Sequence, residues 1–234
     1  MNRLQNPNAI VSLKASIWVS LICCLVISTG CNLIQATDDK QTAPADTPED
    51  VQFGISRMIE RSGAPLEAEK NYRQILAANP KHQQARHRLG VVLLRTERLD
   101  ESIEQLQQAA SLSEPSPDLL GDLGYAYMLS GDLEKSENYL RTAVDKSGDD
   151  QRLVNNLGMV VGFLGRDEES LKLFRRVNSE SEAQSNLAYV LAGRGERGEA
   201  KKRYHAALDR EPNLKQAAKG LAEFYRKPLQ GNNH

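Results

Sequence analysis

Four short stretches recur along the chain: Leu89-Gly90, Leu123-Gly124, Leu157-Gly158 and Leu187-Ala188. The first three pairs are spaced by 34 residues, and the last follows after 30. Apolar residues around each pair recur at helical rather than alternating spacing, and an internal period of this length is typical of stacked two-helix units. The repeat therefore predicts a helical array. For function, it predicts only a broad class, namely proteins that bind another polypeptide.

The composition agrees with one extended helical core. The chain has 234 residues, a net charge of -1, 26% charged residues and 40% hydrophobic residues, which suits a soluble helical protein. No basic stripe dominates any expected helix, so we expect no nucleic acid partner. Six prolines fall at expected helix starts or ends, where a missing N–H does no harm: Pro65, Pro80, Pro115, Pro117, Pro212 and Pro228.

Residues 1–30 differ from the rest of the chain. Arg3 and Lys14 form a cationic start, and an apolar run covers residues 15–27, well before the first acidic residue, Asp38. That run is too short to cross a bilayer comfortably, but it suits the core of an export signal. All three cysteines lie within residues 23–31, so only Cys31 would remain after cleavage and no internal disulfide could form.

Small residues precede Cys31. The Thr29-Gly30-Cys31 sequence resembles the lipobox of bacterial lipoproteins, in which the cysteine is acylated, although Ser28 stands where that motif usually has leucine. The resemblance implies export, lipidation of Cys31 and a lipid anchor in the cell membrane or outer membrane, facing the periplasm. An uncleaved membrane anchor and an ordinary secretory signal are the alternatives. Residues 31–48 are rich in Thr, Ala, Asp and Pro and predict a flexible tether.

Placing each Leu-Gly pair at positions 7 and 8 of a unit aligns small and large residues along the chain. Positions 11, 20, 24 and 27 are Tyr127, Ser136, Leu140 and Ala143 in the third unit and Leu191, Ala200, Tyr204 and Ala207 in the fifth. Small residues opposite large ones let two helices approach closely. The pattern resembles the tetratricopeptide repeat family over residues 49 to about 227.

That resemblance implies an all-α, right-handed superhelical solenoid of about five helix pairs. We expect units near 49–82, 83–116, 117–150, 151–180 and 181–214, a capping helix at 215–227 and a tail at 228–234. Lys219, Glu223 and Arg226 suit the solvated outer face of a cap. The fourth unit is four residues short, so we expect a truncated second helix or a clipped loop there.

Glycines are predicted to end several first helices. Gly131, Gly165 and Gly195 stand where a left-handed backbone is needed for the turn. A literal GxGxxG begins at Gly193, but it falls in one of these turns instead of between a strand and a helix. It therefore does not indicate dinucleotide binding.

The sequence shows no catalytic constellation. The four histidines, at positions 82, 87, 205 and 234, lack the i, i+4 spacing of a helical metal site and are expected at the surface. No nucleophile elbow, Walker loop or kinase signature occurs. We therefore expect no enzymatic activity, no metal, no cofactor and no small-molecule substrate.

The family resemblance implies a peptide-binding concave face lined by first-helix side chains. The residues expected to line this groove are Arg88, Val91, Leu94, Tyr125, Met128, Asn155, Asn156, Met159, Asn186 and Tyr189, with Leu129, Phe163, Arg95 and Arg152 beside them. For Tyr125, Leu129 and Phe163, packing between adjacent helices is an equal alternative. For the three asparagines, burial without a partner would be costly, which favours a groove-facing position.

Further resemblances bear on the ligand of the groove and on the complex in which the protein works. The residues at 87, 91 and 125 depart from the family's carboxylate-clamp pattern, so a chaperone C-terminus is not the expected ligand. The stretches LVNNLGMVVGFLGR (153–166) and SNLAYVLAGRGERGEAKKRYHAAL (185–208) resemble tetratricopeptide lipoproteins of tight-adherence (Flp) pilus assembly. We expect a non-catalytic scaffold that holds protein or peptide segments of an envelope complex. A component of outer-membrane or cell-wall biogenesis, or a regulatory subunit of an enzyme complex, are the alternatives.

Overall fold

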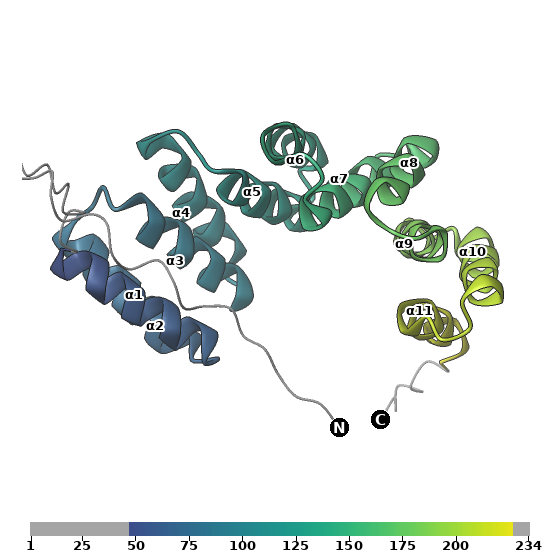
Figure 1. The fold of residues 1–234 in the computed structure, drawn as a ribbon, viewed down its shortest axis with the longest axis horizontal. Coiled ribbons are helices and arrows are strands. Elements are labelled where there is room, and N and C mark those ends of the chain that lie inside the picture. The colour runs from purple at the N-terminus through teal and green to yellow at the C-terminus, as the bar shows by residue number, and fades with distance from the viewer. Residues whose placement is uncertain (1–46, 227–234) are drawn as a thin grey trace, which may run out of the picture. The chain divides into compact units, whose positions relative to one another are not determined.

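The computed structural model describes residues 47–226; the expected export signal, Cys31, most of the expected tether and the tail lie outside the described residues. Residues 47–226 form eleven α-helices and no strand (Figure 1), which confirms the all-α solenoid. The helices are α1 Pro48–Arg61, α2 Pro65–Ala78, α3 Gln83–Arg95, α4 Leu99–Leu112, α5 Pro117–Ser130, α6 Leu133–Ser147, α7 Gln151–Phe163, α8 Asp167–Val177, α9 Glu180–Gly193, α10 Arg197–Arg210 and α11 Lys215–Tyr225. Among these eleven, none has the length and apolar content needed to cross a membrane.

Consecutive helices form pairs, and the pairs stack in chain order. Each odd-numbered helix from α1 to α9 packs against the even-numbered helix that follows it, and α11 packs against both α9 and α10. The first helices of neighbouring pairs also meet, because α3 contacts α5, α5 contacts α7, α7 contacts α9 and α9 contacts α11. These helices line one side of the array (Figure 1), which we call the first-helix face.

Glycine at the eighth position of a unit lets the two helices of a pair touch. A Cβ placed on Gly124 would lie 2.6 Å from Cγ of Leu140, and one placed on Gly158 would lie 2.7 Å from Cε1 of Phe174. The Gly124 carbonyl accepts a hydrogen bond of 2.6 Å from the hydroxyl of Ser136, and the second and fourth pairs repeat this bond. The small residues of the repeat therefore serve both close packing and the pairing of a buried carbonyl.

The turns between the helices of a pair use a left-handed residue, as predicted. Gly131, Gly165 and Gly195 have φ values of 83°, 85° and 86°. In the second pair the same place is taken by Glu97, with φ 63°. A non-glycine residue in this region carries a steric cost, because its Cβ crowds the following carbonyl.

Two charged quartets bind neighbouring pairs on the side formed by the second helices. Glu69 and Arg73 of α2 meet Arg98 and Glu101 at the start of α4, with Arg98 Nη1 2.7 Å from Glu69 Oε1. The same four residue types recur 68 residues further on, as Glu137, Arg141, Arg166 and Glu169. The quartets therefore link the first pair to the second and the third pair to the fourth.

The fourth pair is short, as the sequence predicts. Helix α8 has 11 residues, whereas the other second helices have 14 or 15. Only Asn178 and Ser179 separate α8 from α9. The side chains of Asn178 and Asn155 exchange amide hydrogen bonds of 2.6 and 3.3 Å, and these bonds tie the short connection to α7.

Candidate partner-binding face

Two of the hollows along the array are lined largely by first-helix residues. We call the first the N-terminal groove; it is lined by Phe53, Arg57, Gln84, His87, Arg88, Val91, Ser116, Asp118, Asp122 and Arg152. We call the second the C-terminal pocket; it is lined by Phe163, Tyr189, Ala192, Gly193, Arg197, Tyr204, Gln216, Lys219, Gly220, Glu223 and Phe224. The two hollows have similar volumes, about 510 and 460 Å³, so their chemistry distinguishes them.

A buried carboxylate fixes the arginine of the N-terminal groove. Glu60 of α1 is 4% exposed and accepts a hydrogen bond of 2.8 Å from the Tyr72 hydroxyl. Arg88 of α3 donates to both oxygens of the same carboxylate, through Nε at 3.1 Å and through Nη2. Burial acts to raise the pKa of Glu60, but the bonds from Arg88 and Tyr72 outweigh it and hold that pKa below its usual range. The Arg88 guanidinium is thus already paired with a carboxylate of the same chain.

A second set of charges crosses three units of the same groove. His87 Nε2 lies 2.8 Å from Asp122 Oδ2, and Arg152 Nη1 donates to Asp122 Oδ1 at 3.0 Å. The other guanidinium nitrogen, Nη2, donates to Asp118 at 2.5 Å. All three arginines expected at the groove, Arg88, Arg95 and Arg152, are thus paired with carboxylates of the chain, since Arg95 also lies 3.6 Å from the Glu60 carboxylate.

The histidines are not uniformly at the surface. The side chain of His87 is only 13% exposed, beside Asp122. His82 caps α3 by accepting the Ala85 N–H at 3.2 Å, and its ring lies 5.2 Å from that of Phe53. Only His205 of the three described histidines is exposed, and His234 lies outside the described residues. Within residues 47–226, no three His, Cys, Asp or Glu side chains gather as a metal site would require.

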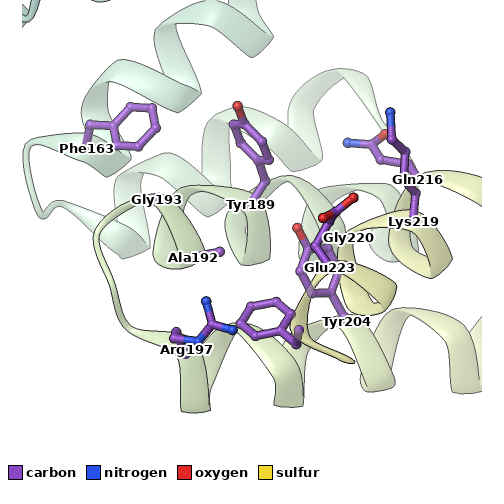
Figure 2. A pocket seen from close by; sticks show the side chains of 11 residues that line it. Phe163, Tyr189, Ala192, Gly193, Arg197, Tyr204, Gln216, Lys219, Gly220 and Glu223 are labelled. Atoms are coloured by element: carbon purple, nitrogen blue, oxygen red, sulfur yellow. The ribbon is translucent and has the colours of Figure 1, made fainter. Parts of the chain in front are cut away.

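The C-terminal pocket is apolar and open. Figure 2 shows Phe163 from α7 and Tyr189 from α9 on one side of it, facing residues of α10 and α11. Tyr189 is 56% exposed, an unusual position for a large ring beside other aromatic side chains. On the opposite wall the guanidinium of Arg197 lies 4.5 Å from the centre of the Phe224 ring. The pocket therefore presents uncovered aromatic surface.

Two glycines let aromatic rings lie against helix backbone in the pocket. A Cβ on Gly193 would come within 2.8 Å of the Phe163 ring, and one on Gly220 within 2.3 Å of the Tyr204 ring. Tyr204 is 2% exposed, and its burial, followed by the neighbouring charge of Tyr189, raises the pKa of Tyr204 to about 12. Its hydroxyl therefore stays protonated at neutral pH.

The predicted groove residues divide among different environments. Asn155 lines neither hollow, and both its amide nitrogen and its amide oxygen hydrogen-bond to Asn178, so a groove role for Asn155 stays a prediction. Asn186 accepts a hydrogen bond of 2.6 Å from Gln216 of α11, which lines the C-terminal pocket. Asn156 and Tyr125 are half-buried, and for them a groove role stays a prediction.

The aliphatic groove residues are mostly packing residues. Val91 and Leu94 pack beside the cluster around Leu123, Met128 beside the cluster around Leu157, and Met159 and Phe163 beside Leu187. Among them, Val91 also lines the N-terminal groove and Phe163 the C-terminal pocket. Leu129 is 50% exposed and lines neither hollow, so it does not pack between helices.

Helix α11 contributes residues that the sequence assigned to a solvated face. Lys219 and Glu223 are exposed, as predicted, and they also line the C-terminal pocket, together with Gln216, Gly220 and Phe224. Applying the repeat frame to this last helix would have found most of them, because 216, 219, 220 and 223 hold positions 2, 5, 6 and 9. Phe224, one residue before the exposed Tyr225, is the aromatic residue that packs against α9 and α10.

Comparison with known proteins identifies the repeats. Two family models described as tetratricopeptide repeat match residues 60–118 and 117–145. A TPR repeat-containing protein of Pseudomonas aeruginosa is 30% identical over 105 residues, which cover 44% of this chain and 18% of that protein. The chain thus matches less than a fifth of that relative's length. It contains tetratricopeptide repeats.

Solved structures support the same fold. The crystal structure of YrrB, described as a TPR protein with an unusual peptide-binding site, has a TM-score of 0.58 at 20% identity, over 72% of this chain and 89% of YrrB. The MamA protein has a TM-score of 0.57 at 18% identity, over 77% of this chain and 97% of MamA. These likenesses show that residues 47–226 fold as a tetratricopeptide solenoid.

Proposed function

We propose that the protein is a non-catalytic scaffold that binds polypeptide segments on its first-helix face, at the C-terminal pocket. The observation that carries this proposal is the uncovered aromatic surface around Tyr189, which is 56% exposed between Phe163 and α11. Apolar hollows with a few polar groups are the usual sites of ligand binding, and aromatic residues are frequent binding hot spots. Tetratricopeptide solenoids typically act as interaction scaffolds rather than as enzymes.

A photo-reactive amino acid at position 189, introduced in the native host, tests this proposal. We expect defined cross-linked adducts that mass spectrometry identifies as one or a few partner proteins. The matched control is the same amino acid at Leu129, which is 50% exposed on α5 but lines neither hollow. Equal labelling at both positions, or none at position 189, would contradict a binding site in the pocket.

We further propose that the protein is exported and held to a membrane by acylation of Cys31. The support is the cationic start, the apolar run at 15–27 and the small residues before Cys31. Cys31→Ala should abolish incorporation of labelled palmitate and move the protein from the membrane fraction to the soluble fraction. Continued labelling would rule out this anchor, and solubility without labelling in the parent chain would favour an ordinary secretory signal.

The partner complex we propose is an envelope assembly such as a Flp pilus or secretion system. The support is the resemblance of residues 153–166 and 185–208 to tetratricopeptide lipoproteins of that kind. Adducts at position 189 with secretin, pilin or pilus-platform proteins would support this assignment. Adducts with outer-membrane or wall-biogenesis proteins would move the protein to that class, and a stoichiometric catalytic partner would make it a regulatory subunit.

A further inference from the structure

The last helix is a wall of the C-terminal pocket and not only the end of the array. Five of the eleven lining residues come from α11, and they face Phe163 and Tyr189 across the hollow (Figure 2). Gly220 brings α11 close to the Tyr204 ring, where any Cβ would clash. The pocket therefore exists only when α11 is docked against α9 and α10.

The volume and the lining of the pocket suit one large apolar side chain. Its volume of about 460 Å³ lies in the range of sites that enclose small ligands. Phe163, Tyr189 and Phe224 offer ring faces and edges to a group inserted between them. An aromatic or long aliphatic side chain would remove this surface from water.

The charges around the pocket are mainly positive and have no acidic partner in the described chain. Arg197 and Lys219 line it, and Lys201 lies 5.5 Å from the Phe224 ring. No carboxylate of residues 47–226 lies within ion-pair distance of these three cations. The acidic lining residue, Glu223, lies 3.4 Å from the Arg226 guanidinium. The N-terminal groove differs, since Arg88 and Arg152 there are paired with carboxylates.

Cation–π contacts hold two of these cations beside aromatic rings of α11, one of them Phe224 of the pocket wall. The guanidinium of Arg197 lies 4.5 Å from the Phe224 ring centre, and Lys201 Nζ lies 4.9 Å from that of Tyr225. Such contacts orient a cation without neutralising it. A carboxylate brought to the rim would therefore gain charge-assisted hydrogen bonds.

We propose that the C-terminal pocket binds an acidic segment of a partner polypeptide, with one bulky apolar side chain inserted beside Tyr189 and flanking carboxylates on Arg197 and Lys219. This inference rests on the proposed function and adds the chemistry of the partner. Charge complementarity selects the acidic segment, and the aromatic walls select its anchor.

Selection from a library of random ten-residue peptides displayed on phage, with the purified full chain as bait, tests the proposal. We expect enrichment of peptides with Asp or Glu within three residues of Phe, Tyr, Trp, Leu or Met. A synthetic peptide of the enriched sequence should lose about tenfold or more in affinity by fluorescence anisotropy when its anchor becomes Ala or its acids become Lys. Enrichment of neutral or basic peptides, or of none, would overturn the proposal.

Two variants of the protein locate the binding. Lys219→Glu and Tyr189→Ala should each weaken the enriched peptide about tenfold. The matched controls are Lys202→Glu, an exposed lysine of α10 that does not line the pocket, and Leu129→Ala, a half-exposed apolar residue of α5 that lines neither hollow. Both controls should bind as the parent does, and thermal melts followed by circular dichroism should show all four folded.

The outcomes separate this inference from the proposed function. Peptide binding that resists Lys219→Glu and Tyr189→Ala would place the peptide elsewhere and overturn the inference. Cross-linking at position 189 to a partner whose bound segment is not acidic would support the proposed scaffold function and contradict the specificity for acidic segments. Adducts between two copies of this chain would make a second copy the occupant and overturn the proposal of a separate partner.

Discussion

The N-terminal groove and the C-terminal pocket share first-helix positions 2, 5, 6 and 9 of the repeat, yet they are opposite in character. In the N-terminal groove, Glu60, Asp118 and Asp122 pair with Arg88, Arg152 and His87. In the C-terminal pocket, Tyr189 is half-exposed and Lys219 has no carboxylate partner in the described chain. Repeat position alone therefore does not identify a binding residue. A binding residue is better identified by asking whether its polar or charged groups already have partners within the chain.

The difference has an energetic basis. An ion pair within the chain would have to be broken before a partner could bind either of its groups. Breaking a buried ion pair is costly. An exposed ring with unpaired cations needs no such rearrangement. We infer that the N-terminal groove stabilises the array and that the C-terminal pocket is free to bind.

The largest expected effect is on stability in the N-terminal groove. Arg88→Met leaves the buried Glu60 carboxylate without its main partner, which should lower the free energy of unfolding by about 3 kcal/mol. Urea unfolding followed by circular dichroism measures this loss. Tyr189→Ala is the matched variant from the pocket, and because its ring is half-exposed the loss should be below about 1 kcal/mol. Equal losses of unfolding free energy in the two variants would contradict the contrast between the N-terminal groove and the C-terminal pocket.

The next effect is the contribution of Glu60 to the pH dependence of stability. The pKa of Glu60 is lower in the folded chain than its usual value of 4.5, so the carboxylate stabilises the fold fully above that pH. This stabilisation is lost as the pH falls through the folded-state pKa. Urea midpoints between pH 7 and pH 3 should therefore fall less in Glu60→Gln than in the parent chain.

Tyr189→Ala is the control for that measurement. It should retain the parent's full pH dependence, because the substitution removes no carboxylate and lies away from Glu60. A Glu60→Gln variant that loses as much stability in acid as the parent would show that other carboxylates carry the whole dependence.

A smaller effect is expected at the turn of the second pair. Glu97 adopts φ 63°, where the other turns have glycine, so Glu97→Gly should raise the free energy of unfolding by about 1 kcal/mol. The reciprocal change Gly131→Glu should lower it by a similar amount. Peptide affinity at the C-terminal pocket should stay unchanged in both variants, and a change there would show that the two regions are coupled.

Local patterns in the sequence were enough to predict the helix pairs and their turns. Gly124 opposite Leu140, and Gly131 at a left-handed turn, each follow from contacts within one unit. The pairing of Arg88 with Glu60 could not be read in the same way, because it joins side chains 28 residues apart in neighbouring units. Such pairs depend on how successive units are rotated against each other, which repeat spacing does not specify.

The site was predicted in part. Tyr189 was identified from its repeat position, and it lines the C-terminal pocket. The hydrogen bonds between Asn155 and Asn178 were not predicted, because they depend on the shortened fourth unit, which brings Asn178 within reach of the Asn155 amide. The exposure of Lys219 and Glu223 was predicted, but their place in the pocket wall was not, because the terminal helix was interpreted only as a cap.

Photo-cross-linking at one position in each hollow most directly tests the contrast between them. The positions are Tyr189 in the C-terminal pocket and Gln84, which is exposed in the N-terminal groove. With equal expression in the native host, partner adducts should form at position 189 and be absent or much weaker at position 84. Partner adducts mainly at position 84 would contradict the assignment of binding to the C-terminal pocket.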